Sequence, residues 1–207
     1  MKHSCVSLEI ERALWLQGIE HIAGVDEAGR GPLAGPVVAA AVVFPRDLTI
    51  EHVDDSKKCT AKQREALFTL IMEQAICVGV GVVDHEVIDR INILQATILA
   101  MRKSIESMNI QPEYAIIDGN SFKHETLKFQ NIIRGDETSF TIAAASIVAK
   151  VTRDRLMRDL DIQFPQYGFA QHKGYGTRQH IDAIRTYGFC EIHRRSFHPS
   201  ALQGKLL

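Results

Sequence analysis

Residues 24–36 have the sequence Gly-Val-Asp-Glu-Ala-Gly-Arg-Gly-Pro-Leu-Ala-Gly-Pro, which contains the strongest structural signals in the chain. It overlaps a short apolar segment, residues 21–25, which predicts a strand that ends on Asp26 and Glu27. The glycines and proline that follow are unsuited to regular structure and predict a loop. The next apolar run, residues 36–44, predicts a strand buried on both faces of a sheet. An acidic pair is therefore expected where a strand meets a loop.

Further along the chain, helical and strand patterns alternate. Helical spacing and capping signals predict helices over residues 7–17, 60–75, 92–108, 138–160 and 177–187. Short apolar runs predict further strands over residues 76–83, 114–117 and 128–133. Alternation of this kind predicts an α/β layer architecture.

Acidic residues also follow two of the later strands. Asp118 ends one strand and Asp136 comes shortly after the next. Ligands of such sheets gather at strand ends, so we expect both to share a site with Asp26 and Glu27. A turn or helix-capping role is the alternative for any one of them, and for Asp136 alone it is the better interpretation.

Length and composition predict an ordinary folded domain. The 207 residues are 45% hydrophobic and 24% charged, which argues against disorder. No apolar run approaches the ~20 residues of a membrane span, and acidic residues interrupt any secretion signal. The four cysteines are scattered, so reduced thiols and a cytoplasmic location are expected. The histidines at 172, 180, 193 and 198 lack zinc spacing, so hydrogen-bonding roles are expected.

Charge is unevenly distributed along the chain. Residues 150–207 contain 10 basic and 5 acidic residues, whereas the rest contains 14 basic and 20 acidic ones. This division would suit an enzyme that holds a metal ion with the acidic part of the chain and a phosphate backbone with its basic C-terminal quarter. Ordinary variation in surface charge is the alternative, and charge alone favours it.

Several blocks, in order, carry a resemblance to one family. They are residues 24–36, 54–57, 117–119, 135–136, 143–154, 174–177 with His180, and 193–197. Together they resemble the signature of bacterial ribonuclease HII. The resemblance implies a ribonuclease-H-like fold, with a five-stranded mixed sheet flanked by helices. It also implies one catalytic domain over residues 1–207, with a helical C-terminal extension from about residue 160. The related ribonuclease HIII family carries an extra N-terminal domain, and this chain resembles the shorter type.

The resemblance also implies an activity and a metal site. The activity is hydrolysis of the RNA strand of RNA–DNA hybrids and cleavage 5′ to ribonucleotides embedded in duplex DNA, leaving 5′-phosphate and 3′-hydroxyl ends. The implied metal ligands are Asp26, Glu27, Asp118 and Asp136. Oxygen ligands suit Mg²⁺ or Mn²⁺, and two such ions can activate water and stabilise the leaving oxygen.

Two expectations follow for the acidic pair. Neighbouring side chains on a regular strand point to opposite faces, so Asp26 and Glu27 are expected to share a site only if the strand ends or bends there. Crowded carboxylates hold protons more tightly, so activity is expected to rise toward alkaline pH and to require a divalent ion.

Substrate contacts are expected from a loop, a tyrosine and basic side chains. A glycine loop lets backbone groups approach a sugar, so Gly29, Arg30 and Gly31 suit recognition of the 2′-hydroxyl. The resemblance implies that Tyr175 packs on the sugar, whereas a half-buried structural tyrosine is the alternative. Phosphate contacts are expected from Lys57, Lys58, Lys150, Lys173, Arg194 and Arg195, with ordinary solvated side chains as the alternative.

Two other functions stay open at this point: a DNA nuclease of related fold, and a non-catalytic hybrid-binding module. The glycine loop and Tyr175 argue against the first, and the four filled acidic positions argue against the second. A monomer is expected, and residues 203–207 are expected to form a tail rather than a docking peptide.

Overall fold

The computed structural model describes residues 6–53 and 59–197 and contains one five-stranded mixed sheet. The sheet order is β3-β2-β1-β4-β5. The strands are β1 (Ile22–Ala28), β2 (Val37–Val43), β3 (Cys77–Val83), β4 (Tyr114–Asp118) and β5 (Lys128–Ile132). β2 pairs antiparallel with β1 and β3, whereas β4 pairs parallel with β1 and β5. The five-stranded mixed sheet that the resemblance implies is confirmed.

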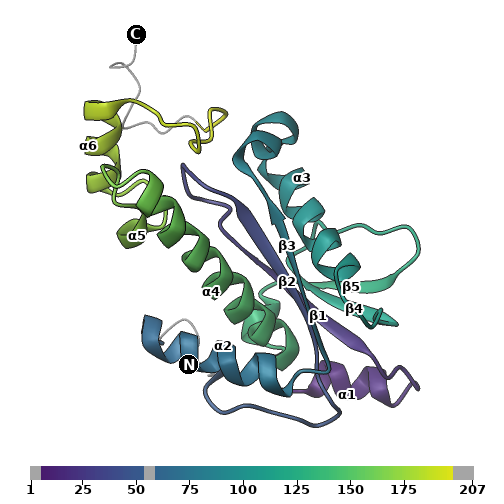
Figure 1. Ribbon diagram of the computed structural model, residues 1–207. Coiled ribbons are helices and arrows are strands. Elements are labelled where there is room, and N and C mark those ends of the chain that lie inside the picture. The colour runs from purple at the N-terminus through teal and green to yellow at the C-terminus, as the bar shows by residue number, and fades with distance from the viewer. Residues whose placement is uncertain (1–5, 54–58, 198–207) are drawn as a thin grey trace, which may run out of the picture.

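Helices cover both faces of this sheet. The helices are α1 (Glu9–Trp15), α2 (Ala61–Gln74), α3 (His85–Glu106), α4 (Phe140–Gln163), α5 (Phe169–His172) and α6 (Arg178–Tyr187). α4 runs along one face and α3 lies on the other, with α5 and α6 beyond the far end of α4 (Figure 1). Within the described ranges no helix is both long and apolar enough to cross a membrane.

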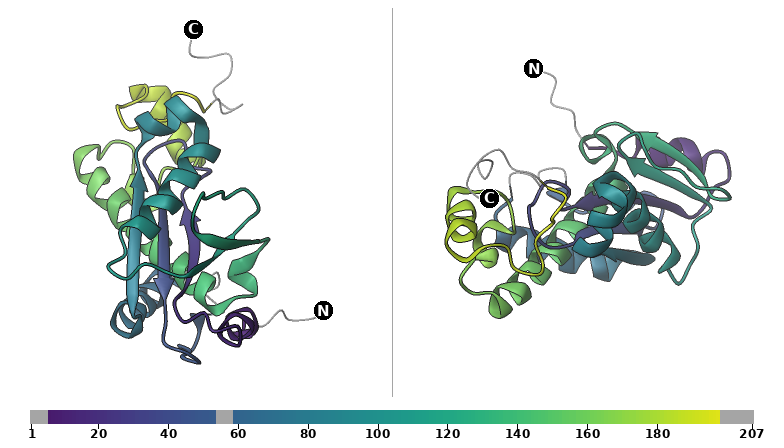
Figure 2. Two further views of the ribbon diagram at one scale, coloured as in Figure 1. Left: turned by 90° about the vertical axis from the view of Figure 1, so that its right-hand side faces the viewer. Right: turned by 90° about the horizontal axis from the view of Figure 1, so that it is seen from above.

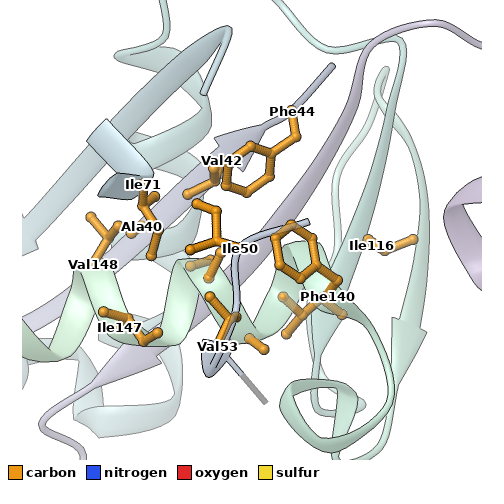
Figure 3. Close-up of a cluster of buried hydrophobic side chains, with 14 of the residues drawn as sticks. Ala40, Val42, Phe44, Ile50, Val53, Ile71, Ile116, Phe140, Ile147 and Val148 are labelled. Carbon is orange, nitrogen blue, oxygen red and sulfur yellow. The ribbon is translucent and has the colours of Figure 1, made fainter. Parts of the chain in front are cut away.

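Strand β2 lies between β3 and β1 and is buried on both faces of the sheet. All seven residues of β2 are buried, as its continuous apolar run predicts. Ala40 and Val42 pack toward Ile147 and Val148 of α4 and Ile71 of α2, as Figure 3 shows. Burial of one such Ile or Val contributes about 1.5–3 kcal/mol. The intervening residues of β2 pack against α3, so both layers are fixed to the same strand.

Helix boundaries follow capping signals in the sequence. Thr60 and Gln63 form the predicted capping box of α2, and Thr177 caps α6 through the backbone N–H of His180. The helix expected from residue 92 instead begins at His85 and breaks at Asn92, whose φ is 66°. The Asn92 side chain then caps the second segment by accepting from the Gln95 N–H at 3.1 Å. The prediction therefore located the start of the second segment of a longer helix that is kinked at Asn92.

The N-terminal helix is tied to the core by a buried carboxylate. Glu11 of α1 is 1% exposed and lies at the beginning of α4. Its Oε1 accepts from the Ser139 hydroxyl at 2.6 Å and from the Thr141 N–H at 3.1 Å. Ser139 itself caps α4 by accepting from the Ile142 N–H. α1 thus supplies an acceptor to the first turn of the longest helix, where the helix dipole favours negative charge.

The C-terminal helices pack on the body through a separate apolar cluster. Phe169, Ile181 and Ile184 meet Leu33 and Met157 there. Figure 2 shows α5 and α6 at the end of the molecule opposite α1. The cluster fixes this end of the chain beside the loop that follows β1.

Candidate active site

Parallel pairing of β1 with β4 brings two acidic residues side by side. Val25 pairs with Ile117, so Asp26 and Asp118 are the next residues on neighbouring strands. One carboxylate oxygen each of Asp26, Glu27 and Asp118 lies within 4.8 Å of the other two. Residues far apart in the sequence therefore form a cluster of oxygen donors, as their positions at strand ends predict.

The expectation that β1 ends or bends at the acidic pair is wrong. β1 continues to Ala28, and its register with β2 runs without interruption through Asp26↔Ala40 and Glu27↔Ala39. Asp26 therefore lies on the α4 face, whereas Glu27 follows Val25 on the α3 face. On the side of β4 the pairing of β1 stops at Val25. The Glu27 side chain, one methylene longer than that of Asp26, still brings an oxygen within 4.8 Å of the Asp26 and Asp118 oxygens.

Backbone N–H groups and one arginine orient the three carboxylates. The Asp26 Oδ1 accepts from the Glu27 N–H at 2.7 Å, and the Asp118 Oδ1 accepts from the Gly135 N–H at 2.7 Å. Arg30 donates to the Glu27 Oε1 at 3.2 Å. These hydrogen bonds fix the directions in which the carboxylates point, which suits a preorganised site.

Asp136 lies in the short 3₁₀ turn η2 (Gly135–Glu137) that follows β5. The capping role that its position favoured is wrong, because Ser139 caps α4. Asp136 lines the same cavity as the three clustered carboxylates. Its oxygens are not part of the group within 4.8 Å, which comprises Asp26, Glu27 and Asp118.

The carboxylates open into a cavity of about 540 Å³. Its lining is Asp26, Glu27, Ala28, Gly29, Arg64, Asp118, Arg134, Asp136, Ser146, Ile147, Lys150 and Tyr175. Sequence reasoning missed Arg64 of α2 and Arg134, because nothing in the local pattern of either residue distinguishes it from a solvated arginine. Arg134 has a left-handed φ of 57°, which a motif search does not reveal. The cavity thus combines acidic donors with cations at its edge.

Burial and mutual repulsion make these acids hold protons tightly. Burial, followed by repulsion from Glu27 and Asp118, raises the pKa of Asp26 well above its usual value. Burial also raises the pKa of Glu27, although Arg30 opposes this, and burial raises the pKa of Asp118. A bound cation would relieve this repulsion.

The loop after β1 is held by buried guanidinium groups. Arg194 is 1% exposed and donates from Nε to the Gly35 carbonyl at 2.9 Å. Its two other nitrogens donate to the carbonyls of Arg30 at 3.0 Å and Gly29 at 2.7 Å. The predicted phosphate contact of Arg194 does not fit this burial. Arg194 instead fixes the glycine loop from behind.

Arg153 holds the rest of the same loop. It is also 1% exposed. Its side-chain nitrogens donate to the carbonyls of Pro36, Ala34 and Lys173. Gly29 has a φ of +99°, and a Cβ there would lie 2.0 Å from the Arg153 Nε. Glycine is therefore required at position 29 both by conformation and by space.

Of the other residues predicted to contact the substrate, some line the acidic cavity and others do not. Tyr175 is 44% exposed in the cavity, and a Cβ on Gly31 would lie 3.6 Å from its ring. Lys173 lines an adjacent cavity of about 250 Å³. Arg195 stacks on Phe189, 5.1 Å from the ring centroid, and is not among the residues of the acidic cavity. Lys57 and Lys58 lie outside the described residues.

Several known proteins are similar to this chain. The family model for ribonuclease HII matches residues 23–200. Ribonuclease HII from Acholeplasma laidlawii is 53% identical over 94% of this chain and 96% of its own length. Ribonuclease HII from Geotalea daltonii is 56% identical over 92% of this chain and 88% of its own. The crystal structure of ribonuclease H2 from Pyrococcus horikoshii OT3 is similar with a TM-score of 0.72 and 28% identity, covering 86% of this chain and 94% of that one. The chain therefore belongs to the ribonuclease HII family and is an endoribonuclease that acts on RNA–DNA hybrids.

Proposed function

We propose that this chain also cuts 5′ to ribonucleotides embedded in duplex DNA, and that it uses two divalent ions, Mg²⁺ or Mn²⁺. The observation that carries the proposal is the group of three carboxylate oxygens within 4.8 Å, which lies beside the glycine loop and Tyr175. Hard divalent ions prefer oxygen donors of this kind. We further propose that residues 1–207 act as one catalytic domain, with residues 160–207 as its extension, and that the chain is a monomer.

Asp26, Asp118, Glu27 and Asp136 have different roles as metal ligands in this proposal. Asp26 and Asp118 are the central ligands because they lie on adjacent strands. Glu27 and Asp136 would complete the two ion positions. When bound, the ions supply the positive charge that activates water and stabilises the leaving 3′-oxygen. The products are a 5′-phosphate and a 3′-hydroxyl.

Recognition of the substrate is assigned to the loop and Tyr175. Gly29 and Gly31 leave room for backbone groups to approach the sugar with the 2′-hydroxyl. Arg30, which is half exposed and pairs with Glu27, lies near the scissile phosphate in this proposal. Lys57, Lys150, Lys173 and Arg195 remain candidates for phosphate contacts, which salt would weaken.

The proposed function is tested by cleavage of three matched duplexes. One is all DNA, one is an RNA–DNA hybrid, and one is DNA with a single ribonucleotide. With either ion we expect cleavage of the second and third, 5′ to the ribonucleotide in the third, and rates that rise toward alkaline pH, because burial raises the pKa of Asp26, Glu27 and Asp118. Cleavage of the all-DNA duplex would favour a related-fold DNA nuclease instead. Binding without cleavage would favour a binding module.

Tyr175 provides a separate test of sugar recognition. Replacement by Ala should lower kcat/KM on the single-ribonucleotide duplex by roughly 10- to 100-fold, because a misplaced sugar loses its alignment with the acids. Tyr175→Phe keeps the ring and should lose less. Wild-type rates in both variants would refute the role of Tyr175. Steady-state cleavage of the single-ribonucleotide duplex is the measurement.

A further inference from the structure

Three buried histidines lie directly behind Tyr175, in the part of the fold that joins α5, α6 and the segment after α6. His180 and His193 are 0% exposed, and His172 is 8% exposed. The rings of His172 and His180 are stacked with their centroids 4.5 Å apart. None of the three lines the acidic cavity, so the reaction itself does not account for them.

The hydrogen bonds of these rings have one consistent direction. The Cys190 N–H donates to the His193 Nδ1 at 3.0 Å, so in a neutral ring the proton of His193 is on Nε2. That Nε2 lies 3.0 Å from the His180 Nε2 and therefore donates to it. The proton of His180 is then on Nδ1, which lies 3.0 Å from the Tyr175 carbonyl oxygen. The His193 Nδ1 also lies 3.0 Å from the Cys190 Sγ, so the thiol and the backbone N–H of Cys190 share this one acceptor.

His172 holds the residue before the tyrosine in the same way. Its Nδ1 accepts from the Gly174 N–H at 3.2 Å, and its Nε2 donates to the Tyr167 carbonyl at 2.8 Å. Gly174 has a φ of +81°, and a Cβ there would lie 2.6 Å from the Ala34 carbonyl oxygen. The backbone that carries Tyr175 is thus fixed by two imidazoles and by close contact with the loop after β1.

Neutral rings are required for this arrangement, because a doubly protonated imidazole has no acceptor. Burial lowers the pKa of His180 to about 4 and that of His193 to about 3. Burial also lowers the pKa of His172. At neutral pH all three rings therefore carry a single proton.

We propose that His180 and His193 are positioning residues: their directional hydrogen-bond chain, from the Cys190 N–H to the Tyr175 carbonyl, holds the Tyr175 ring over the acidic cavity and so aligns the ribonucleotide. The inference rests on the proposed role of Tyr175 in sugar recognition. It assigns the histidines no contact with substrate. Their effect on cleavage passes through the tyrosine.

A double-mutant cycle tests whether the effect passes through Tyr175. His180→Phe keeps a ring in the core and removes both polar nitrogens. On the single-ribonucleotide duplex it should lower kcat about 10-fold with KM within about twofold, because alignment rather than binding is lost. In a Tyr175→Ala background the same substitution should change kcat less than about twofold. His21→Phe, which removes a half-exposed ring outside the cavity, is the matched control and should leave kcat unchanged.

Each result of the cycle has a defined meaning. Equal losses from His180→Phe in both backgrounds, or no loss in either, would overturn the positioning role and leave the proposed function standing. A wild-type rate for Tyr175→Ala would overturn the positioning role together with the proposed role of Tyr175 in sugar recognition, whereas cleavage of the single-ribonucleotide duplex would still stand.

Imidazole nitrogen NMR of the wild-type protein at pH 7 tests the chain without relying on a folded variant. We expect the ring proton on Nε2 in His193 and on Nδ1 in His180. A proton on Nδ1 of His193, or a charged ring at either position, would overturn the inference.

Discussion

Asp118→Asn is expected to reduce hybrid cleavage on the order of a thousandfold while duplex binding stays within about twofold. The Asn Oδ1 can still accept from the Gly135 N–H, so the turn beside the site should keep its shape. What is lost is the negative charge beside Asp26 that a divalent ion requires. At 1.36 kcal/mol for each tenfold change, the loss corresponds to about 4 kcal/mol of transition-state stabilisation.

Cleavage rates and fluorescence anisotropy of a labelled hybrid measure the two effects. Asp84→Asn is the matched control, because Asp84 caps α3 and Asn caps equally well. The wild-type enzyme in excess chelator should lose activity to a similar extent and regain it on addition of Mg²⁺. Cleavage by Asp118→Asn above about a tenth of the wild-type rate would contradict the site assignment.

Arg194→Ala is expected to destabilise the protein by about 4 kcal/mol, because it leaves two buried carbonyls and one partly buried carbonyl without their donors. For a chain of this length the midpoint of thermal unfolding should fall by roughly 10 °C. Arg194→Lys should recover little of this, since one ammonium cannot reproduce the planar guanidinium fork. Thermal unfolding followed by circular dichroism is the measurement.

The neighbouring arginine offers a control for this substitution. Arg195 is exposed, and its bond to Asp89 is made by its backbone N–H, which Arg195→Ala preserves. Arg195→Ala should therefore change stability by no more than about 0.5 kcal/mol. Equal shifts for the two variants would show that Arg194 does not hold the loop.

The sequence could predict those parts of the fold that depend on local pattern. Apolar runs located β2 and β3, and caps located the starts of α2 and α6. It could also predict that Asp26 and Asp118 meet, because each follows a short apolar strand segment and these two segments pair in parallel. Family resemblance, rather than pattern alone, supplied Asp136 and Tyr175.

What could not be predicted depends on contacts between distant segments. The apolar pattern did not predict that β1 continues to Ala28. Beyond Val25 this strand pairs with β2 and no longer with β4, and the local pattern does not reveal such a contact. The sequence predicts a phosphate contact for Arg194, and only the folded loop provides the three carbonyls that make its burial favourable. The histidine chain likewise depends on how α6 packs against the segment that follows it.

The contacts of the Glu11 carboxylate place the start of the folded unit before the region that the family model matches. The family model matches only from residue 23, yet Glu11 supplies the acceptor for Ser139 and Thr141 at the start of α4. A chain cut where the family model begins would leave the Ser139 hydroxyl proton and the Thr141 N–H without their acceptor, at the helix that also lines the active-site cavity. The boundary of the family model and the structural boundary of this enzyme are therefore different, and the first helix belongs with the catalytic body.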